Sequence, residues 1–122
     1  MSTASHQLHD EVATTLERWR ADEVRVRAHL AAPGISRPEQ VMDKTGLQMF
    51  EAIRDGLLPS VPIGAALDFV PIEFEPGRMV FQGHPSPRFC NPMGSIHGGW
   101  IATLLDSAVA CAVHTTLPAG RA

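Results

Sequence analysis

An apolar segment that follows two glycines constrains the fold of this chain more than any other feature. His97-Gly98-Gly99 leads into residues 100–116, where most side chains are apolar and Asp106 is the one acid. Glycines favour a tight turn, and the apolar run after them predicts a helix over 97–116. A helix that is apolar nearly all round is normally buried. The sequence therefore predicts a central helix that other elements surround.

The start of this predicted helix has the features of an oxyanion site. Gly98 and Gly99 leave backbone N–H groups uncovered, and the helix dipole adds partial positive charge there. A carbonyl oxygen can approach closely, which suits acyl transfer. Asp106 is the candidate reacting or base-acting carboxylate, because an acid inside an apolar helix is costly to bury without a partner or a function. The alternative is an acid that pairs with an arginine or caps a loop.

The spacing of these residues predicts a site shared by two subunits. Gly98 and Asp106 are eight residues apart, which is roughly 12 Å along a helix at ~1.5 Å per residue. One helix therefore cannot place its own first amide and its own Asp106 on the same reacting atom. Two antiparallel copies across a two-fold axis could each supply one half of a site. We expect a homodimer or a homotetramer.

The segment Asn91–Ala108 resembles the motif of PaaI-type hotdog-fold acyl-CoA thioesterases, in which an antiparallel sheet wraps around a long helix that begins at a His-Gly-Gly. The pattern combines an Asn six residues before the His, two glycines, and an Asp nine residues after the His. Residues 69–83 are similar to the family's first hairpin, and 45–67 resemble it more weakly. The resemblance implies an α+β hotdog fold.

The resemblance also implies the hydrolysis of acyl-CoA thioesters without a metal or a cofactor. By this resemblance, the Gly98 amide polarises the thioester carbonyl, and Asn91 places the attacking water or the acyl end. Asp106 of the partner subunit acts as general base or nucleophile. His97 and Gly99 contribute to substrate binding, and His97 is mostly a positioning residue. The alternatives are an ordinary Asx-turn for Asn91 and close helix-to-sheet packing for the glycines.

The family's sheet continues after the central helix, and a Ser or Thr on the next strand often belongs to the active site. Here the helix is followed by the turn-like segment Leu117–Ala122. A hotdog domain needs about three more strands, on the order of 35–50 residues. We therefore expect an incomplete hotdog domain with little or no activity of its own. A non-catalytic acyl-CoA-binding or oligomerisation relative, or an inactive fragment, is the alternative.

Composition narrows the function classes. The formal net charge is −3 at pH 7, and no basic cluster offers a footprint for nucleic acid. No apolar segment resembles a secretory signal or approaches the ~18 residues of a membrane span. Cys90 and Cys111 are the only cysteines, and neither they nor the histidines show a metal-binding spacing. We expect a cytoplasmic protein with reduced thiols, no metal and no membrane partner.

Residues 1–44 are predicted to form an extra N-terminal amphipathic helix over 7–31, stopped by Pro33-Gly34, and a linker over 33–44. We expect the apolar stripe of this helix to pack on the domain or on its dimer mate. A regulatory or membrane-surface helix is the alternative. The stripe consists of Leu8, Val12, Leu16, Trp19, Val26 and Leu30.

Residues 45–122 are predicted to form the partial thioesterase domain. Thr45 or Asp43 is expected to cap a helix that ends near Gly56, and 63–67 form one helical turn. Strands over 67–75 and 78–83 flank a turn signal with Pro and Gly in suitable places. Residues 84–92 hold three of the ten prolines and are expected to form the loop that delivers Asn91 to the central helix. Trp100 is expected to serve in core or interface packing, and stacking on a ligand is the alternative.

Overall fold

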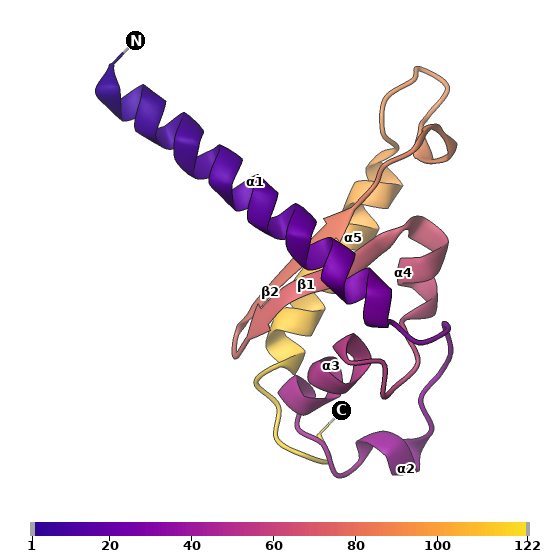
Figure 1. The fold of residues 1–122 in the computed structure, drawn as a ribbon. Coiled ribbons are helices and arrows are strands. Elements are labelled where there is room, and N and C mark those ends of the chain that lie inside the picture. Colours follow the sequence, from indigo (N-terminus) through magenta and orange to yellow (C-terminus); the bar gives the residue numbers. More distant parts are fainter. Residues whose placement is uncertain (1, 122) are drawn as a thin grey trace.

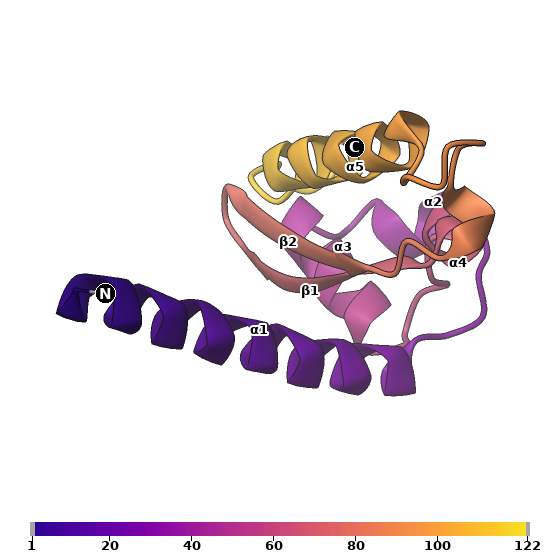
Figure 2. The same cartoon turned by 90° about the horizontal axis from the view of Figure 1, so that it is seen from above.

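The computed structural model describes residues 2–121 and has an α+β architecture in three layers (Figures 1 and 2). A two-stranded antiparallel hairpin forms the middle layer. Helix α1 (Thr3–His29) crosses one face of the hairpin, and helix α5 (Gly98–His114) lies on the other face. Three shorter helices lie at one end: α2 (Pro38–Val41), α3 (Gly46–Arg54) and α4 (Pro62–Leu67).

The hairpin consists of β1 (Phe69–Glu75) and β2 (Arg78–Gly83), which confirms the two predicted strands with a later start for the first. Gly77 has a φ of 79° after Pro76, so the turn residues suit the pairing of Glu75 with Arg78. Within residues 2–121 no further strand joins this sheet. The segment therefore does not form the wrapped sheet that a hotdog domain requires.

Helix α1 packs on the hairpin along its second half only. Val26 is buried in a cluster with Val70 and Ile72, the side chains of β1 that pack against α1. The first half projects beyond the hairpin in both views of the ribbon. Leu8 and Val12 in this half are 61% and 51% exposed. The predicted apolar stripe thus has a partner surface over part of its length.

Helix α3 forms where the sequence predicts it, because its first turn is capped. Thr45 Oγ1 accepts a hydrogen bond from the Gln48 N–H (3.1 Å), and Gln48 Oε1 accepts one from the Thr45 N–H (2.9 Å). The helix contributes Phe50 and Ile53 to a buried cluster against Leu58. The short helix α2 lies in the segment that was predicted to be only a linker.

Helix α5 begins and ends near its predicted limits; it is covered on one side and bare on the other, as expected for a hotdog domain whose sheet is incomplete. Trp100 is its one buried residue. Four apolar side chains at every fourth position stay exposed on the opposite side: Ile101 (44%), Leu105 (59%), Val109 (66%) and Val113 (61%). The hairpin and α3 cover one side of α5, and nothing in residues 2–121 covers the other.

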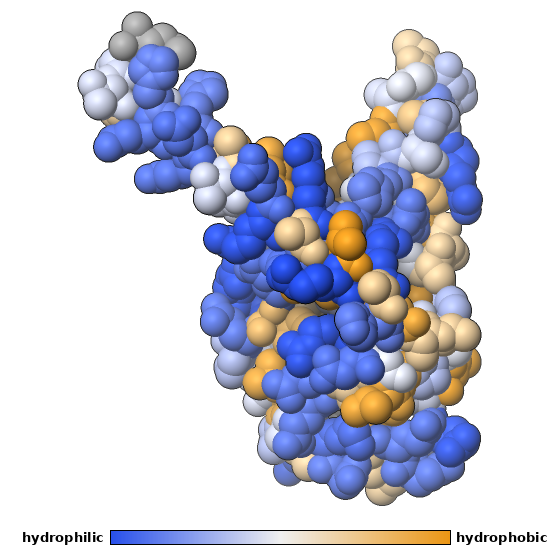
Figure 3. Space-filling model, in the orientation of Figure 1, coloured by the Kyte–Doolittle hydropathy of each residue, from blue (hydrophilic) through white to orange (hydrophobic). Residues whose placement is uncertain are grey.

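The space-filling view shows two arms that stand apart above the body of the molecule (Figure 3). One arm is the projecting half of α1, and the other is the segment between β2 and α5, which includes the 3-10 helix η1 (Pro87–Phe89). None of the helices in residues 2–121 combines the length and the apolar character that crossing a bilayer requires.

Candidate active site at the start of helix α5

The first amides of α5 differ in what they bind. The Gly99 N–H donates to Nδ1 of His97 (2.8 Å), and the Trp100 N–H donates to the carbonyl oxygen of His97 (3.0 Å). The Gly98 N–H has no hydrogen-bond partner among the described residues, and a Cβ at Gly98 would meet no atom within 4 Å. Gly98 therefore presents an open amide at the positive end of the helix dipole.

His97 is the N-cap of α5, and this role explains the glycine at position 99. A Cβ at Gly99 would lie 2.9 Å from Nδ1 of His97, so a side chain there would displace the cap. The Gly99 amide is occupied by His97. It is therefore not free to bind a substrate carbonyl in this state, although the sequence placed Gly99 among the substrate-binding residues.

Asn91 organises the loop that leads into the helix. Its Oδ1 accepts hydrogen bonds from the N–H groups of Met93 (2.9 Å) and Ser95 (3.3 Å), and its Nδ2 donates to Ser95 Oγ (2.8 Å). This is the Asx-type arrangement that was the alternative to a role in placing water. The His97 N–H donates to the Phe89 carbonyl (2.8 Å), which fixes the loop against the start of α5.

A groove of about 370 Å³ lies beside the start of α5. Phe89 stacks on Trp100 along it, with ring centroids 6.2 Å apart, and Trp100 Nε1 donates to the Leu67 carbonyl (2.8 Å). The guanidinium of Arg88 lies 4.8 Å from the Phe89 ring centroid. The volume is near the lower end of the range for small-molecule sites. The lining residues are Leu67, Arg88, Phe89, Cys90, His97, Gly99, Trp100 and Thr103.

Sequence reasoning missed Arg88, Phe89 and Thr103 as groove residues. Arg88 and Phe89 lie in a proline-rich loop, which has no periodic pattern that would show which side chains face a neighbour. The one signal in the sequence was Phe89, an aromatic residue in this proline-rich loop close to the two glycines. Thr103 lies on α5 one turn after Gly99, whose carbonyl accepts a hydrogen bond from Thr103 Oγ1 (2.8 Å).

Asp106 lies on the bare side of α5 and is exposed. The ion pairs within residues 2–121 are formed by other acids, so the arginine partner considered from the sequence is not found there. Gly98 and Asp106 belong to one continuous helix and are separated by roughly 12 Å along its axis at ~1.5 Å per residue. A single chain does not bring the two groups together.

Cys111 is a poor candidate for a nucleophile. Cys111 is half-buried against the core, and burial raises the pKa of its thiol, with the negative charge of Asp106 as a second cause. A thiol with a raised pKa is mostly protonated at neutral pH. Cys90 Sγ lies 3.9 Å from the Ser86 carbonyl oxygen. Among the described residues, no three His, Cys, Asp or Glu side chains are grouped as metal ligands would be.

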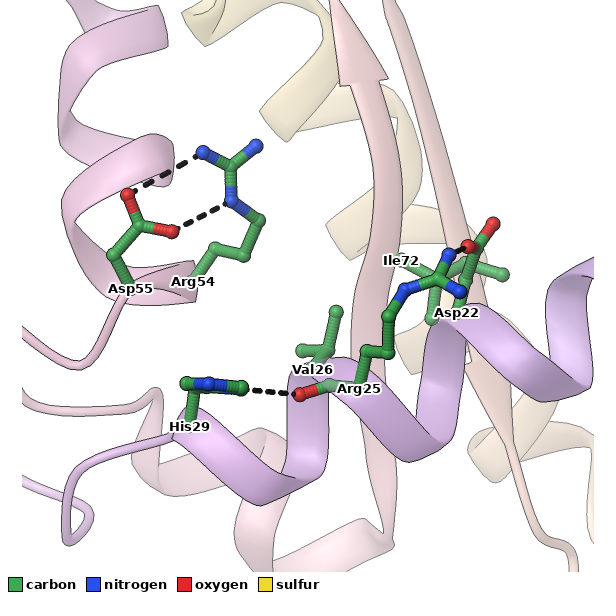
Figure 4. A pocket seen from close by; sticks show the side chains of 7 residues that line it. All are labelled: Asp22, Arg25, Val26, His29, Arg54, Asp55 and Ile72. Carbon is green, nitrogen blue, oxygen red and sulfur yellow. Dashed lines mark hydrogen bonds and ion pairs between the residues drawn. The ribbon is translucent and has the colours of Figure 1, made fainter.

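A second hollow of about 370 Å³ lies between α1 and the end of α3 (Figure 4). Its charged side chains pair with one another. Arg54 Nε donates to Asp55 (2.9 Å), which raises the pKa of Arg54 and lowers that of Asp55. Arg25 pairs with Asp22, and the ring of His29 bonds to the Arg25 carbonyl (2.8 Å). Because these pairs already satisfy the charges, this hollow is a weaker candidate than the start of α5.

The candidate site therefore consists of an open amide, a groove with an aromatic floor and, on the bare side of the same helix, an unpaired acid. The hydrogen bonds at the helix start, the groove and the exposure of the acid are each observed in the structure. Comparisons of the chain with family models, with curated proteins and with solved structures found no match.

Proposed function

We propose that this chain supplies both halves of a thioesterase site that forms between two copies. The Gly98 N–H is the donor to the thioester carbonyl, and Asp106 of the partner subunit is the general base or the nucleophile. One observation carries the proposal: a free amide and a free carboxylate occur on the same helix, next to a bare apolar face.

The bare face of α5 is the surface that would join the copies. Two such helices, packed antiparallel at the usual ~8–10 Å between axes, bury the first part of each apolar stripe, Ile101 and Leu105, against the partner helix. A two-fold axis near Ala102, midway between Gly98 and Asp106, places each Gly98 beside Asp106 of the partner subunit. A thioester carbonyl between the helices is then within reach of both groups.

The chemistry follows from these positions. The carbonyl oxygen of an acyl-CoA thioester accepts a hydrogen bond from the Gly98 N–H, and the helix dipole stabilises the negative charge that develops on it. Asp106 of the partner subunit takes a proton from water as the water oxygen bonds to the carbonyl carbon. The carbon–sulfur bond breaks, and the CoA sulfur receives the proton. Phe89 and Trp100 offer an apolar surface to the substrate.

The proposed fold of the complete site is of the hotdog type. The hairpin already covers one side of α5, as the first strands of such a sheet would. Further strands that continue the sheet around α5 would exclude water from the reacting carbonyl and strengthen the electrostatic interactions there. In this proposal the described residues supply the reacting groups and the first part of the acyl-binding surface.

Substitution of Gly98 tests the proposal without disturbing the helix. Gly98→Pro removes the N–H, and proline is favoured at the first position of a helix. His97 has φ −62° and ψ 132°, which a residue before proline readily adopts. Gly98→Ala is the matched control, because it keeps the N–H and its Cβ meets no atom within 4 Å.

The measurement is thiol release from short- and medium-chain acyl-CoA by the associated protein. We expect Gly98→Pro to lower kcat by about 100-fold or more, as for the loss of one oxyanion donor, and Gly98→Ala to stay near wild type. Equal activity of the two variants would contradict the role of the amide. Absence of thiol release from any acyl-CoA by a wild-type protein whose sheet is completed around α5 would contradict the proposed reaction.

A non-catalytic relative that binds acyl-CoA is the second candidate. The engagement of Asn91 with its own loop favours it, because the side chain that was expected to place water is already bonded to Met93 and Ser95. This candidate predicts saturable binding of an acyl-CoA without thiol release, which the same assay separates from hydrolysis when combined with calorimetry.

A further inference from the structure

Two arginines of this chain lie over the ring of a phenylalanine, and they differ in their partners. The Cζ atom of Arg54 lies 5.2 Å from the ring centroid of Phe74, and its guanidinium binds the Asp55 carboxylate through two hydrogen bonds of 2.9 and 3.4 Å (Figure 4). The Cζ atom of Arg88 lies 4.8 Å from the ring centroid of Phe89. The ion pairs among the described residues are formed by other side chains. Arg88 therefore keeps the planar set of donors with which Arg54 holds a carboxylate.

The guanidinium of Arg88 is held in place, although the residue is exposed. Its Nη2 donates to the carbonyl oxygen of Ala66 (3.1 Å) in α4, and the face of the Phe89 ring supplies the second contact. The bond to Ala66 uses one of the guanidinium N–H groups, so the others remain for a ligand. A charged group that is fixed before a ligand arrives loses less conformational entropy on binding.

The groove beside the start of α5 surrounds this guanidinium with neutral and apolar groups. Among the described residues that line it, Arg88 is the one arginine or lysine, and none is an acid. The stacked rings of Phe89 and Trp100 form the floor. A ligand that fills the groove displaces water from the guanidinium, which is costly unless an anion replaces that water. The groove therefore favours a ligand that combines an apolar body with an anionic end.

The position of Arg88 in the loop indicates which part of a thioester meets it. The carbonyl oxygen of the next residue, Phe89, accepts a hydrogen bond from the His97 N–H (2.8 Å), and Gly98 follows directly. The backbone of Arg88 thus lies close to the amide that is proposed to bind the thioester carbonyl. The acyl chain begins at this carbonyl, whereas the phosphates of CoA are separated from it by the whole pantetheine arm. A short acyl chain is therefore the part of the substrate that matches this separation.

We propose that the acyl group of the substrate ends in a carboxylate, which Arg88 binds in the groove. The substrate class is then a thioester of a short dicarboxylic acid. The apolar part of the acyl chain lies on Phe89 and Trp100, and its carboxylate binds Arg88 as Asp55 binds Arg54. This inference rests on the proposed function for the thioester, and it makes Arg88 a specificity-determining residue.

Thioesters of N-acetylcysteamine test the proposal, because they carry no phosphate. In a protein whose sheet is completed around α5, we expect kcat/KM to be at least about tenfold higher for the adipoyl than for the hexanoyl thioester, as for a charge-assisted hydrogen bond. Arg88→Gln should make the two values equal. Arg20→Gln is the matched control and should keep the preference, since Arg20 is exposed on α1 and forms no ion pair among the described residues.

Binding to the chain itself separates this proposal from the proposed reaction. Adipic acid monoamide carries the carboxylate without a thioester, and hexanamide is its neutral counterpart. Titrations followed by NMR should show at least about tenfold tighter binding of the monoamide, and Arg88→Gln should abolish the difference. Such binding by a protein that releases no thiol from any thioester would contradict the reaction and support the carboxylate site.

Three results would overturn the proposal. The first is equal kcat/KM for the adipoyl and hexanoyl thioesters in the wild-type protein, and the second is a preference that Arg88→Gln retains. The third is an effect of Arg88→Gln that is equal for adipoyl-CoA and hexanoyl-CoA and absent with the N-acetylcysteamine thioesters. That result would place the phosphates of CoA, and not the acyl carboxylate, at Arg88.

Discussion

Helices α1 and α5 lie on opposite faces of one hairpin, and both leave apolar surface bare, but in different ways. Helix α1 packs on the hairpin over its second half, whereas its first half is bare, so the covered and bare parts follow one another along the helix axis. Helix α5 is in contact with the rest of the chain over most of its length but on one side only. Its covered and bare parts therefore lie on opposite sides of the helix. The first pattern leaves apolar surface beyond the edge of the hairpin, and the second leaves it on the side of α5 that faces away from the hairpin.

The two bare surfaces also differ in chemistry. The stripe of α1 is accompanied by the buried indole Nε1 of Trp19, which has no acceptor among the described residues, and by the exposed Glu11. The bare side of α5 carries Asp106 and begins at the open amide of Gly98. The difference teaches that exposed apolar area alone does not identify a reactive site. The surface bordered by the Gly98 amide and the Asp106 carboxylate is the one for which we propose a catalytic role.

The largest expected effect concerns this difference in chemistry. In a protein whose sheet is completed around α5, Asp106→Asn should lower kcat for an acyl-CoA by about 1,000-fold with KM nearly unchanged, because it removes the proposed reacting carboxylate with little change in volume. Asp10→Asn, an exposed acid on the projecting half of α1, should leave kcat unchanged. Steady-state kinetics of both variants provides the check. Equal kcat values for the two variants would contradict a catalytic role that belongs to the acid on α5 and not to the acid on α1.

Complementation between two inactive variants tests whether the α5 surfaces of two copies meet. In a protein whose sheet is completed around α5, a Gly98→Pro chain and an Asp106→Ala chain each lack one half of the proposed site, so a mixed dimer contains one intact pair. Random mixing should restore about a quarter of the wild-type activity. Heterodimers that form, shown by native mass spectrometry, but remain inactive would rule out a shared site.

The two sides of α5 should also differ in stability. Trp100 is 8% exposed and Leu105 is 59% exposed. Trp100→Ala should cost about 3–5 kcal/mol of unfolding free energy through the cavity it creates, whereas Leu105→Ala in the dissociated chain should change it by less than ~0.5 kcal/mol. Urea unfolding at low protein concentration measures both. A large cost for Leu105→Ala would show that this side is covered even in the single chain.

The smallest effect concerns the attachment of α1 to the hairpin. Hydrogen bonds from Arg78, and secondly from Arg18 on α1, lower the pKa of Glu73. The ionised carboxylate therefore stabilises the fold above the ordinary value of about 4.3, and this contribution is lost as the pH falls through the lower pKa of the folded state. Thermal unfolding should show a smaller loss of Tm between pH 7 and pH 3 in Glu73→Gln than in wild type. Glu17→Gln, on an exposed residue, should behave as wild type.

The elements were predictable from the sequence because their signals are local. Pro76-Gly77 determines the turn, Thr45 determines a helix start, and the glycines after His97 determine another. Each of these depends on residues within one turn of chain. The resulting α+β class and the limits of the hairpin and of α5 are confirmed, with shifts of a few residues.

The arrangement around these elements was less predictable. The apolar pattern of α5 predicts that the helix is buried but does not identify the element that covers it. In residues 2–121, one side of the helix has no cover. The groove depends on how the loop containing Arg88 and Phe89 folds back on Trp100, which no periodicity encodes. The engagement of Asn91 and of the Gly99 amide depends on side-chain conformations. The open amide of Gly98 was predictable because a helix start leaves such groups without partners.

The cap at the start of α5 has a consequence for the direction of proton transfer. Because the Gly99 N–H donates to Nδ1 of His97, that nitrogen supplies a lone pair, and a neutral ring must carry its hydrogen on Nε2. In this tautomer the outer nitrogen can give a hydrogen bond and cannot accept a proton. His97 is therefore available to a ligand only as a donor. In the proposed reaction, a water molecule at this helix would therefore lose its proton to another group, and a carboxylate is suited to receive it.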